Sequence, residues 1–148
     1  QTQNVIQEQY HKEIPSRIIE ENEEALAVLE IRPISKGHSI IISKSEIKDA
    51  KELSPKTIEL SQKVAKQIQD NLKPKSVEIQ TENKFGEVII NIIPIYDEKL
   101  DIFSERTEPS ESDLEKTYQE IIKKKKVSKK ERQVEEDTEK IRLERKIP

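Results

Sequence analysis

Residues 13–44 read EIPSRIIEENEEALAVLEIRPISKGHSIIISK, and they contain most of the strand signals of the first half of the chain. Two apolar or alternating runs, 17–21 and 25–31, flank the turn residues Asn22-Glu23-Glu24, which predicts a β-hairpin. Arg32-Pro33 ends the second strand because proline cannot donate to a sheet ladder. A loop over 33–37 then leads into a short, strongly apolar strand over 38–44. The segment therefore predicts three consecutive strands.

Downstream residues add one clear helix and two more strands. Ser54 and Pro55 are a typical N-cap and first helical residue, which predicts a helix over 55–72. Its spacing predicts that one face packs on the sheet through Ile58, Val64, Ile68 and Leu72. Further strands are predicted over 77–81 and 87–93, joined by a turn at 83–86. This order is typical of an α+β fold with a mostly antiparallel sheet of about five strands.

The composition changes near residue 104, so we divide the chain into a domain over 1–103 and a charged helical tail over 104–148. Pro109-Ser110 starts a helical pattern with a narrow apolar stripe of Leu114, Tyr118, Ile121 and Ile122. A helix of this length is marginal in water, so it should dock on its own domain, a second copy or a partner.

A basic cluster follows this stripe. It holds seven cations within ten residues, namely Lys123, Lys124, Lys125, Lys126, Lys129, Lys130 and Arg132. Such a run can contact nucleic acid phosphates or an acidic protein surface, or it can form a solvated helix face. We name it as the candidate interaction site of the tail.

The bulk composition excludes several classes of function. The 148 residues carry 27 Lys and Arg against 30 Asp and Glu, and a net charge of −3 argues neither for nucleic acid nor for membrane. Cysteine is absent, so a disulfide, a thiolate nucleophile and a cysteine-based zinc site are all excluded. This fits a reducing compartment, and we expect a cytoplasmic protein. No apolar run is long enough for a membrane span, and no signal peptide is visible.

Several elements of the sequence resemble the histidine triad (HIT) family over roughly residues 4–98. They are Ile14-Pro15-Ser16, Glu30-Ile31-Arg32-Pro33, Gly37-His38, Ser43-Lys44 and the strand ending Asn91-Ile92-Ile93-Pro94. The resemblance implies a HIT-like fold and a homodimer in which two sheets join across a two-fold axis. It also implies that Glu30 contacts ribose hydroxyls and that His38 belongs to the nucleotide site.

The family signature His-x-His-x-His is missing, because its positions read Glu87, Ile89 and Asn91. In the family the middle histidine is the nucleophile that accepts a nucleotidyl group. A covalent intermediate needs a lone pair, and Ile89 has none. The zinc-binding cysteines of many members would fall at Asn4 and Gln7. We therefore expect neither a bound metal nor another cofactor.

Each remaining position also has a purely structural interpretation. His38 could fill the turn where its strand begins, and Glu30 could be an exposed carboxylate at a strand end. Asn91, alone in an apolar strand, must find hydrogen-bond partners or cost about 1–3 kcal/mol, so we expect a bond to a neighbouring loop.

The resulting hypothesis is a catalytically degenerate HIT-like domain that acts by binding, with residual nucleotide affinity through Glu30 and His38. One alternative is an active nucleotide hydrolase or nucleotidyl transferase with a rearranged site. Another is a ribonucleoprotein or scaffold component that acts through its basic tail. Ile89 separates the first hypothesis from the second, since an aliphatic side chain offers no route through the family's chemistry.

Overall fold

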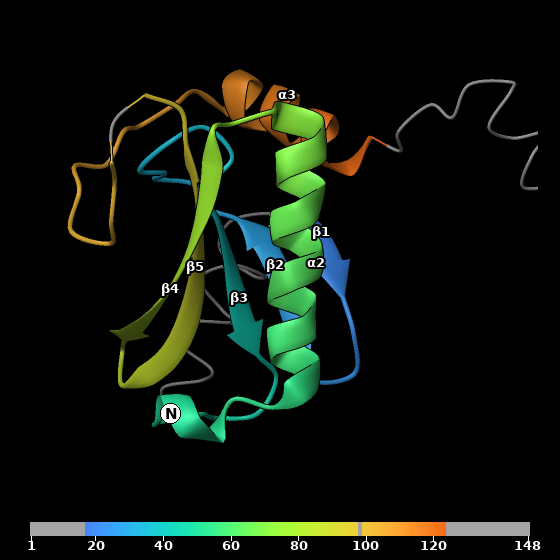
Figure 1. The fold of residues 1–148 in the computed structure, drawn as a ribbon, viewed down its shortest axis with the longest axis vertical. Helices are drawn as coiled ribbons and strands as arrows, with labels where there is room; N and C mark the ends of the chain where they lie inside the picture. Colours follow the sequence, from blue (N-terminus) through green and yellow to red (C-terminus); the bar gives the residue numbers. More distant parts are fainter. Residues whose placement is uncertain (1–16, 98, 124–148) are drawn as a thin grey trace, which may run out of the picture.

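The computed structural model describes residues 17–97 and 99–123, and these form one five-stranded sheet with two helices (Figure 1). The strands are β1 (Ile18–Glu21), β2 (Ala25–Leu29), β3 (Ser39–Ser43), β4 (Ser76–Lys84) and β5 (Glu87–Ile95). Their order in the sheet is β1-β2-β3-β5-β4, and every neighbouring pair is antiparallel. The predicted α+β class with five strands is confirmed.

The first hairpin forms where the turn residues predicted it. The side-chain oxygen of Asn22 accepts hydrogen bonds from the backbone N–H groups of Glu24 and Ala25, both at 2.9 Å. This local bonding by asparagine stabilises the turn between β1 and β2. β2 ends at Leu29, two residues before the predicted end, because the chain turns there into the loop that leads to β3.

The second hairpin has a tighter turn than predicted. Phe85 and Gly86 both have positive φ, at 54° and 79°, which is the two-residue turn whose twist matches that of its flanking strands. Lys84 pairs with Glu87 across this turn, so β4 extends beyond its predicted end at residue 81. β4 lies at the edge of the sheet, while every residue of β5 is buried.

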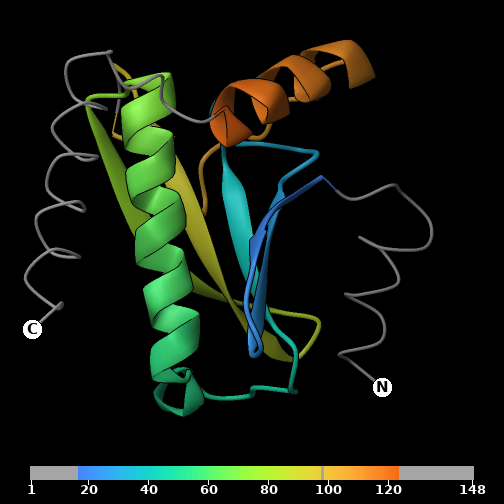
Figure 2. The same cartoon turned by 90° about the vertical axis from the view of Figure 1, so that its right-hand side faces the viewer.

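Helix α2 (Pro55–Leu72) has the predicted bounds and covers one face of the sheet (Figure 2). The hydroxyl oxygen of Ser54 accepts from the N–H of Thr57 and caps its first turn. Val64 and Ile68 are fully buried, as predicted. The prediction for Ile58 is wrong: its side chain is 42% exposed, and Leu60, at 2%, is buried in the core instead. The buried face is centred on 60, 64 and 68, which turns Ile58 toward solvent.

A short 3-10 helix, η2 (Ala50–Glu52), precedes α2, and helix α3 (Glu111–Ile122) lies across one end of the sheet (Figure 2). Leu114 and Ile121 of α3 are buried in the same core cluster as Ile19 and Val64. The side-chain amides of Gln67 and Asn71 on α2 both donate to the Ile121 carbonyl, at 3.0 Å and 2.7 Å. Of the three docking surfaces considered, α3 therefore uses its own domain.

Most of the basic cluster lies outside the described residues, which include only its first member, Lys123. The same holds for the Ile14-Pro15-Ser16 element and for Asn4 and Gln7. The division of the chain at residue 104 stays a prediction. Neither helix within 17–97 and 99–123 is long and apolar enough to cross a membrane.

Candidate functional site

The structure brings the candidate residues of the resemblance onto one face of the sheet. Ile40 on β3 pairs with Asn91 on β5, and alternate residues of a strand share a face. Glu87, Ile89 and Asn91 therefore lie on the same face as Ile40. The intervening residues of β5, Ile90 and Ile92, contribute to the core beneath α2, so the candidate site occupies the opposite face.

His38 is fully buried and uses both of its ring nitrogens within the protein. Its Nδ1 accepts a hydrogen bond from the backbone N–H of Ile34, at 3.0 Å. Its Nε2 lies 2.7 Å from Oδ1 of Asn91, so Nε2 carries the proton and donates it there. Burial lowers the pKa of His38, although the bond to Asn91 and the charge of Glu30 oppose this. His38 is therefore a neutral imidazole that holds its loop against the sheet.

Asn91 connects His38 to the edge strand. Its amide nitrogen donates to Oε1 of Glu82 on β4, at 2.9 Å, while its oxygen accepts from His38. Asn91 was expected to find a hydrogen bond, and the structure gives it two partners. Sequence reasoning missed Glu82. Its only sequence signal was the alternation of β4, which puts Glu82 on one face with Gln80 and Glu78.

Glu30 is buried, at 3% exposure, so the interpretation as an exposed strand-end carboxylate is wrong. Its Oε1 lies 3.5 Å from Nη1 of Arg106 and accepts from the N–H of Arg32 at 3.4 Å. Arg106 also donates to the Arg32 carbonyl, at 2.9 Å. The arginine thus joins the segment before α3 to the end of β2. It carried no sequence signal, because the charged segment around it gives no pattern.

Ile89, at the position that the resemblance predicts for the family's nucleophile, is 1% exposed. It belongs to an apolar cluster with Leu26, Val28, Ile40 and Ile42. Among the described residues, the centre of this face is therefore a packed cluster of aliphatic side chains. Its polar residues are at the periphery of this cluster.

Glu87, which the resemblance predicts to stand at the first triad position, is buried without a complete set of partners. Its Oε2 finds no hydrogen-bond partner among the residues that the structure describes. Burial raises the pKa of Glu87, and the nearby charge of Glu46 adds to the effect. A carboxyl group in these surroundings resists ionisation.

Taken together, His38, Asn91 and Glu82 form one chain of hydrogen bonds, and Glu30 lies near Arg106 beside it. Within the described ranges 17–97 and 99–123, no group of three or more His, Cys, Asp or Glu side chains could hold a metal ion. The site defines a protein class: an α+β domain with a five-stranded antiparallel sheet and a buried histidine–asparagine pair at its centre.

A family model provides the identification. The model described as the HIT domain matches residues 11–92, and this chain belongs to the HIT family. The predicted membership is confirmed. No curated protein matches.

Solved structures agree with the fold. A HIT-like protein from Bartonella henselae, described as involved in cell-cycle regulation and as containing an unknown ligand, has a TM-score of 0.63 at 20% identity, covering 80% of this chain and 93% of its own. A hypothetical histidine triad nucleotide-binding protein from Sulfolobus tokodaii also scores 0.63 at 20% identity, over 82% and 88%. A zinc-bound family member from Mycobacterium smegmatis scores 0.59 at 22% identity, over 79% and 91%. At these identities the likeness concerns the fold.

Proposed function

We propose that this chain is a HIT-domain protein that acts by binding and does not carry out the nucleotidyl transfer of its family. The observation that carries the proposal is Ile89, buried in an apolar cluster at the position of the family's nucleophile. Nucleotidyl transfer through a covalent intermediate requires a lone pair at that position. Members of this family are typically nucleotide-binding hydrolases or transferases. An isoleucine at the nucleophile position therefore bears directly on function.

The surrounding residues support the same conclusion. A nucleophile at another position would need an available lone pair and access to the substrate. Both nitrogens of His38 are occupied by Ile34 and Asn91, and its ring is fully buried. The carboxylate of Glu30 is held near Arg106. An active enzyme with a rearranged site would have to break several of these bonds.

The test is turnover of adenosine phosphoramidate or a dinucleoside polyphosphate, followed as release of the mononucleotide. We expect release no faster than in buffer alone. A His38→Gln variant, purified in the same way, controls for contaminating enzymes. Release by the unmodified protein that this variant lacks would overturn the proposal and favour the rearranged-site alternative.

Residual nucleotide binding through Glu30 and His38 is a second, separable part of the proposal. A carboxylate suits a ribose diol because it can accept two hydrogen bonds. A nucleotide would have to compete with Arg106 and with Asn91 for these side chains. Calorimetry with adenine and guanine nucleotides tests this part, and the absence of heat at millimolar concentration would remove it.

The basic tail is the other candidate for binding. α3 ends at Ile122, and the cluster of cations begins at the next residue, Lys123. Asn71 donates to the Lys123 carbonyl at 2.9 Å, so the domain fixes the point from which the cluster starts. We propose that Lys123–Lys126, Lys129, Lys130 and Arg132 contact phosphates or acidic protein surface, as in a ribonucleoprotein or scaffold component. Binding of this kind weakens steeply with added salt.

A further inference from the structure

Phe103 is an exposed aromatic residue on a well-ordered turn. The chain has only two phenylalanines, and neither lies in the core: Phe85 is 51% exposed and Phe103 is 88% exposed. Phenylalanine is among the residues most often found inside proteins. The buried core of the described residues consists of Ile, Leu, Val and Ala, and the exposed ring of Phe103 lies outside it.

Hydrogen bonds at four consecutive backbone N–H groups hold this turn. The N–H of Asp101 donates to the Ser104 hydroxyl, that of Ile102 to the Gln80 side chain, that of Phe103 to the Asp101 carboxylate, and that of Ser104 to the Asp101 carbonyl. Ile102 packs with Ile93 and Ile95. The turn therefore presents Phe103 with little backbone freedom left to lose on binding, which favours association.

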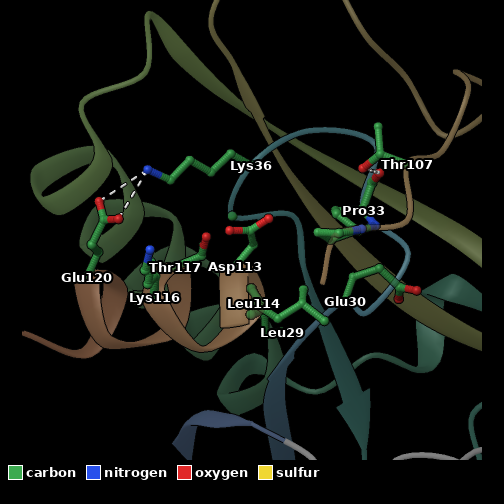
Figure 3. Close-up of a pocket in the computed structure, with 12 residues that line it drawn as sticks. Leu29, Glu30, Pro33, Lys36, Thr107, Asp113, Leu114, Lys116, Thr117 and Glu120 are labelled. Atoms are coloured by element: carbon green, nitrogen blue, oxygen red, sulfur yellow. Dashed lines mark hydrogen bonds and ion pairs between the residues drawn. The ribbon is translucent and has the colours of Figure 1, made fainter. Parts of the chain in front are cut away.

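The same chain has a pocket of about 310 Å³ between α3 and the loop that follows β2. Figure 3 shows Lys36 reaching to Glu120 at one end of the pocket, and Pro33 and Glu30 near the other. Apolar groups of Leu29, Pro33, Pro109 and Leu114 line it. A dry apolar cavity of roughly 150 Å³ already accommodates a benzene ring. This pocket therefore has room for a phenylalanine side chain and part of its turn.

We propose that a second copy of the chain inserts Phe103 into this pocket. An exposed apolar side chain and a pocket that none of the described residues fills can be complementary between two copies of one chain. Phe103 does not fill the pocket of its own chain, because 88% of it is exposed. If each of two copies inserts its Phe103 into the pocket of the other, the assembly is a closed dimer. If each copy inserts into the next one instead, the assembly becomes larger as the concentration rises.

The charges at the pocket rim predict how this contact responds to salt. Lys36 is paired with Glu120, Glu30 lies near Arg106, and Lys116 and Asp113 also line the pocket, so three positive and three negative charges balance. The contact therefore depends on apolar burial and should change little with ionic strength. Association through the basic tail would instead weaken steeply with salt.

Site-specific photo-crosslinking tests the contact directly. A copy of the full chain with a benzophenone amino acid at position 103 is mixed with an isotopically labelled copy and irradiated. We expect labelled peptides from residues 29–37 or 107–120 to be joined to position 103. No adduct with the labelled copy, or adducts only elsewhere, would overturn the proposal.

Self-association measured by sedimentation provides the second readout, with every variant made in an Ile79→Lys background so that pairing of the exposed β4 edge does not contribute. We expect Phe103→Ser to weaken association at least tenfold, and Thr117→Trp, which fills the pocket, to do the same. Phe85→Ser is the matched control, with an exposed phenylalanine on a different turn, and should change nothing. A protein that is monomeric up to high concentration, or one whose association ignores both Phe103→Ser and Thr117→Trp, would show that the contact does not exist. Neither outcome bears on catalysis, so the proposed function is tested separately.

Discussion

Among single residues, His38 shows how both nitrogens of one imidazole can be bonded within the protein. Its ring is fully buried, its Nδ1 accepts from Ile34, and its Nε2 donates to Asn91. Only the neutral tautomer satisfies both bonds, because protonated Nδ1 would face the N–H of Ile34. The pKa of His38 is lowered by burial, which favours the same neutral ring that these two hydrogen bonds require.

This arrangement predicts a loss of stability in mild acid. Because the pKa of His38 is lowered in the folded state, the unfolded state binds the proton first. The free energy of unfolding should therefore fall as the pH drops below the unfolded value of about 6.5. Urea unfolding of the His38→Gln variant measures this: it should lack that pH dependence and lose about 1–3 kcal/mol at neutral pH. A variant with the same pH dependence as the unmodified protein would contradict the assignment.

Glu87 should make the free energy of unfolding depend on pH in the opposite direction to His38. Its pKa is raised in the folded state, mainly by burial, so the folded state binds the proton more tightly. Its contribution to stability should therefore fall as the pH rises from the unfolded value of about 4.3 through the folded one. Glu87→Gln removes the charge and should raise the free energy of unfolding at neutral pH by up to about 1 kcal/mol. Thermal unfolding at neutral pH and at pH 4 compares the two proteins, and a destabilised variant at neutral pH would contradict this account.

The sequence located the candidate residues but not their partners. The family elements identified Glu30 and His38, and alternation along the last strand placed Glu87, Ile89 and Asn91 on one face. The partners Glu82 and Arg106 lie on segments whose sequence is mostly polar. A contact between residues far apart in the chain leaves no local pattern when its members are ordinary surface residue types.

Among the elements, α3 determines where the tail can be truncated, because α3 is part of the folded core. Leu114 and Ile121 complete a core cluster that includes Leu60 and Ile68 of α2. Arg17 adds ion pairs to Glu111 and Glu115 of α3, at 3.2 Å and 3.3 Å. A truncation meant to remove only the basic tail should therefore begin after Lys123 and leave α3 in place.

We predict that α3 contributes strongly to stability through Ile121. This residue is fully buried, so Ile121→Ala should lower the free energy of unfolding by about 2–5 kcal/mol through lost burial and a residual cavity. Ile58→Ala is the matched control, because Ile58 is 42% exposed on α2 and should cost well under half as much. Equal losses in urea unfolding would mean that α3 is only loosely attached.

Elements with strong local signals were predicted well. The Ser54-Pro55 start gave the bounds of α2, and the apolar runs gave the five strands. Predictions were weaker where tertiary packing decides. Ile58 follows the apolar periodicity of α2 yet points outward, and Asn83 and Lys84 look like turn residues yet pair in the edge strand β4. Polar residues are tolerated there because the outer edge of β4 has no strand partner among the described residues.

At the scale of the whole molecule, we expect a homodimer that joins two sheets. β4 is a nine-residue edge strand with Ile79 43% exposed, and an edge of this length is a template for pairing. Light scattering at micromolar concentration should give about twice the monomer mass of 17.3 kDa. Ile79→Lys should shift it toward the monomer, whereas Phe103→Ser should not. A monomer mass for the unmodified protein would contradict the edge-joined dimer.

Intact mass spectrometry shows whether a nucleotidylated form of this protein exists, which the proposed function excludes. The full chain is incubated with adenosine phosphoramidate, quenched in acid and weighed. With Ile89 at the position that the resemblance predicts for the nucleophile, we expect only the unmodified mass at every time point. A covalent nucleotidyl adduct that accumulates with time and disappears on hydrolysis would contradict it, and peptide mapping of that adduct would identify the nucleophile.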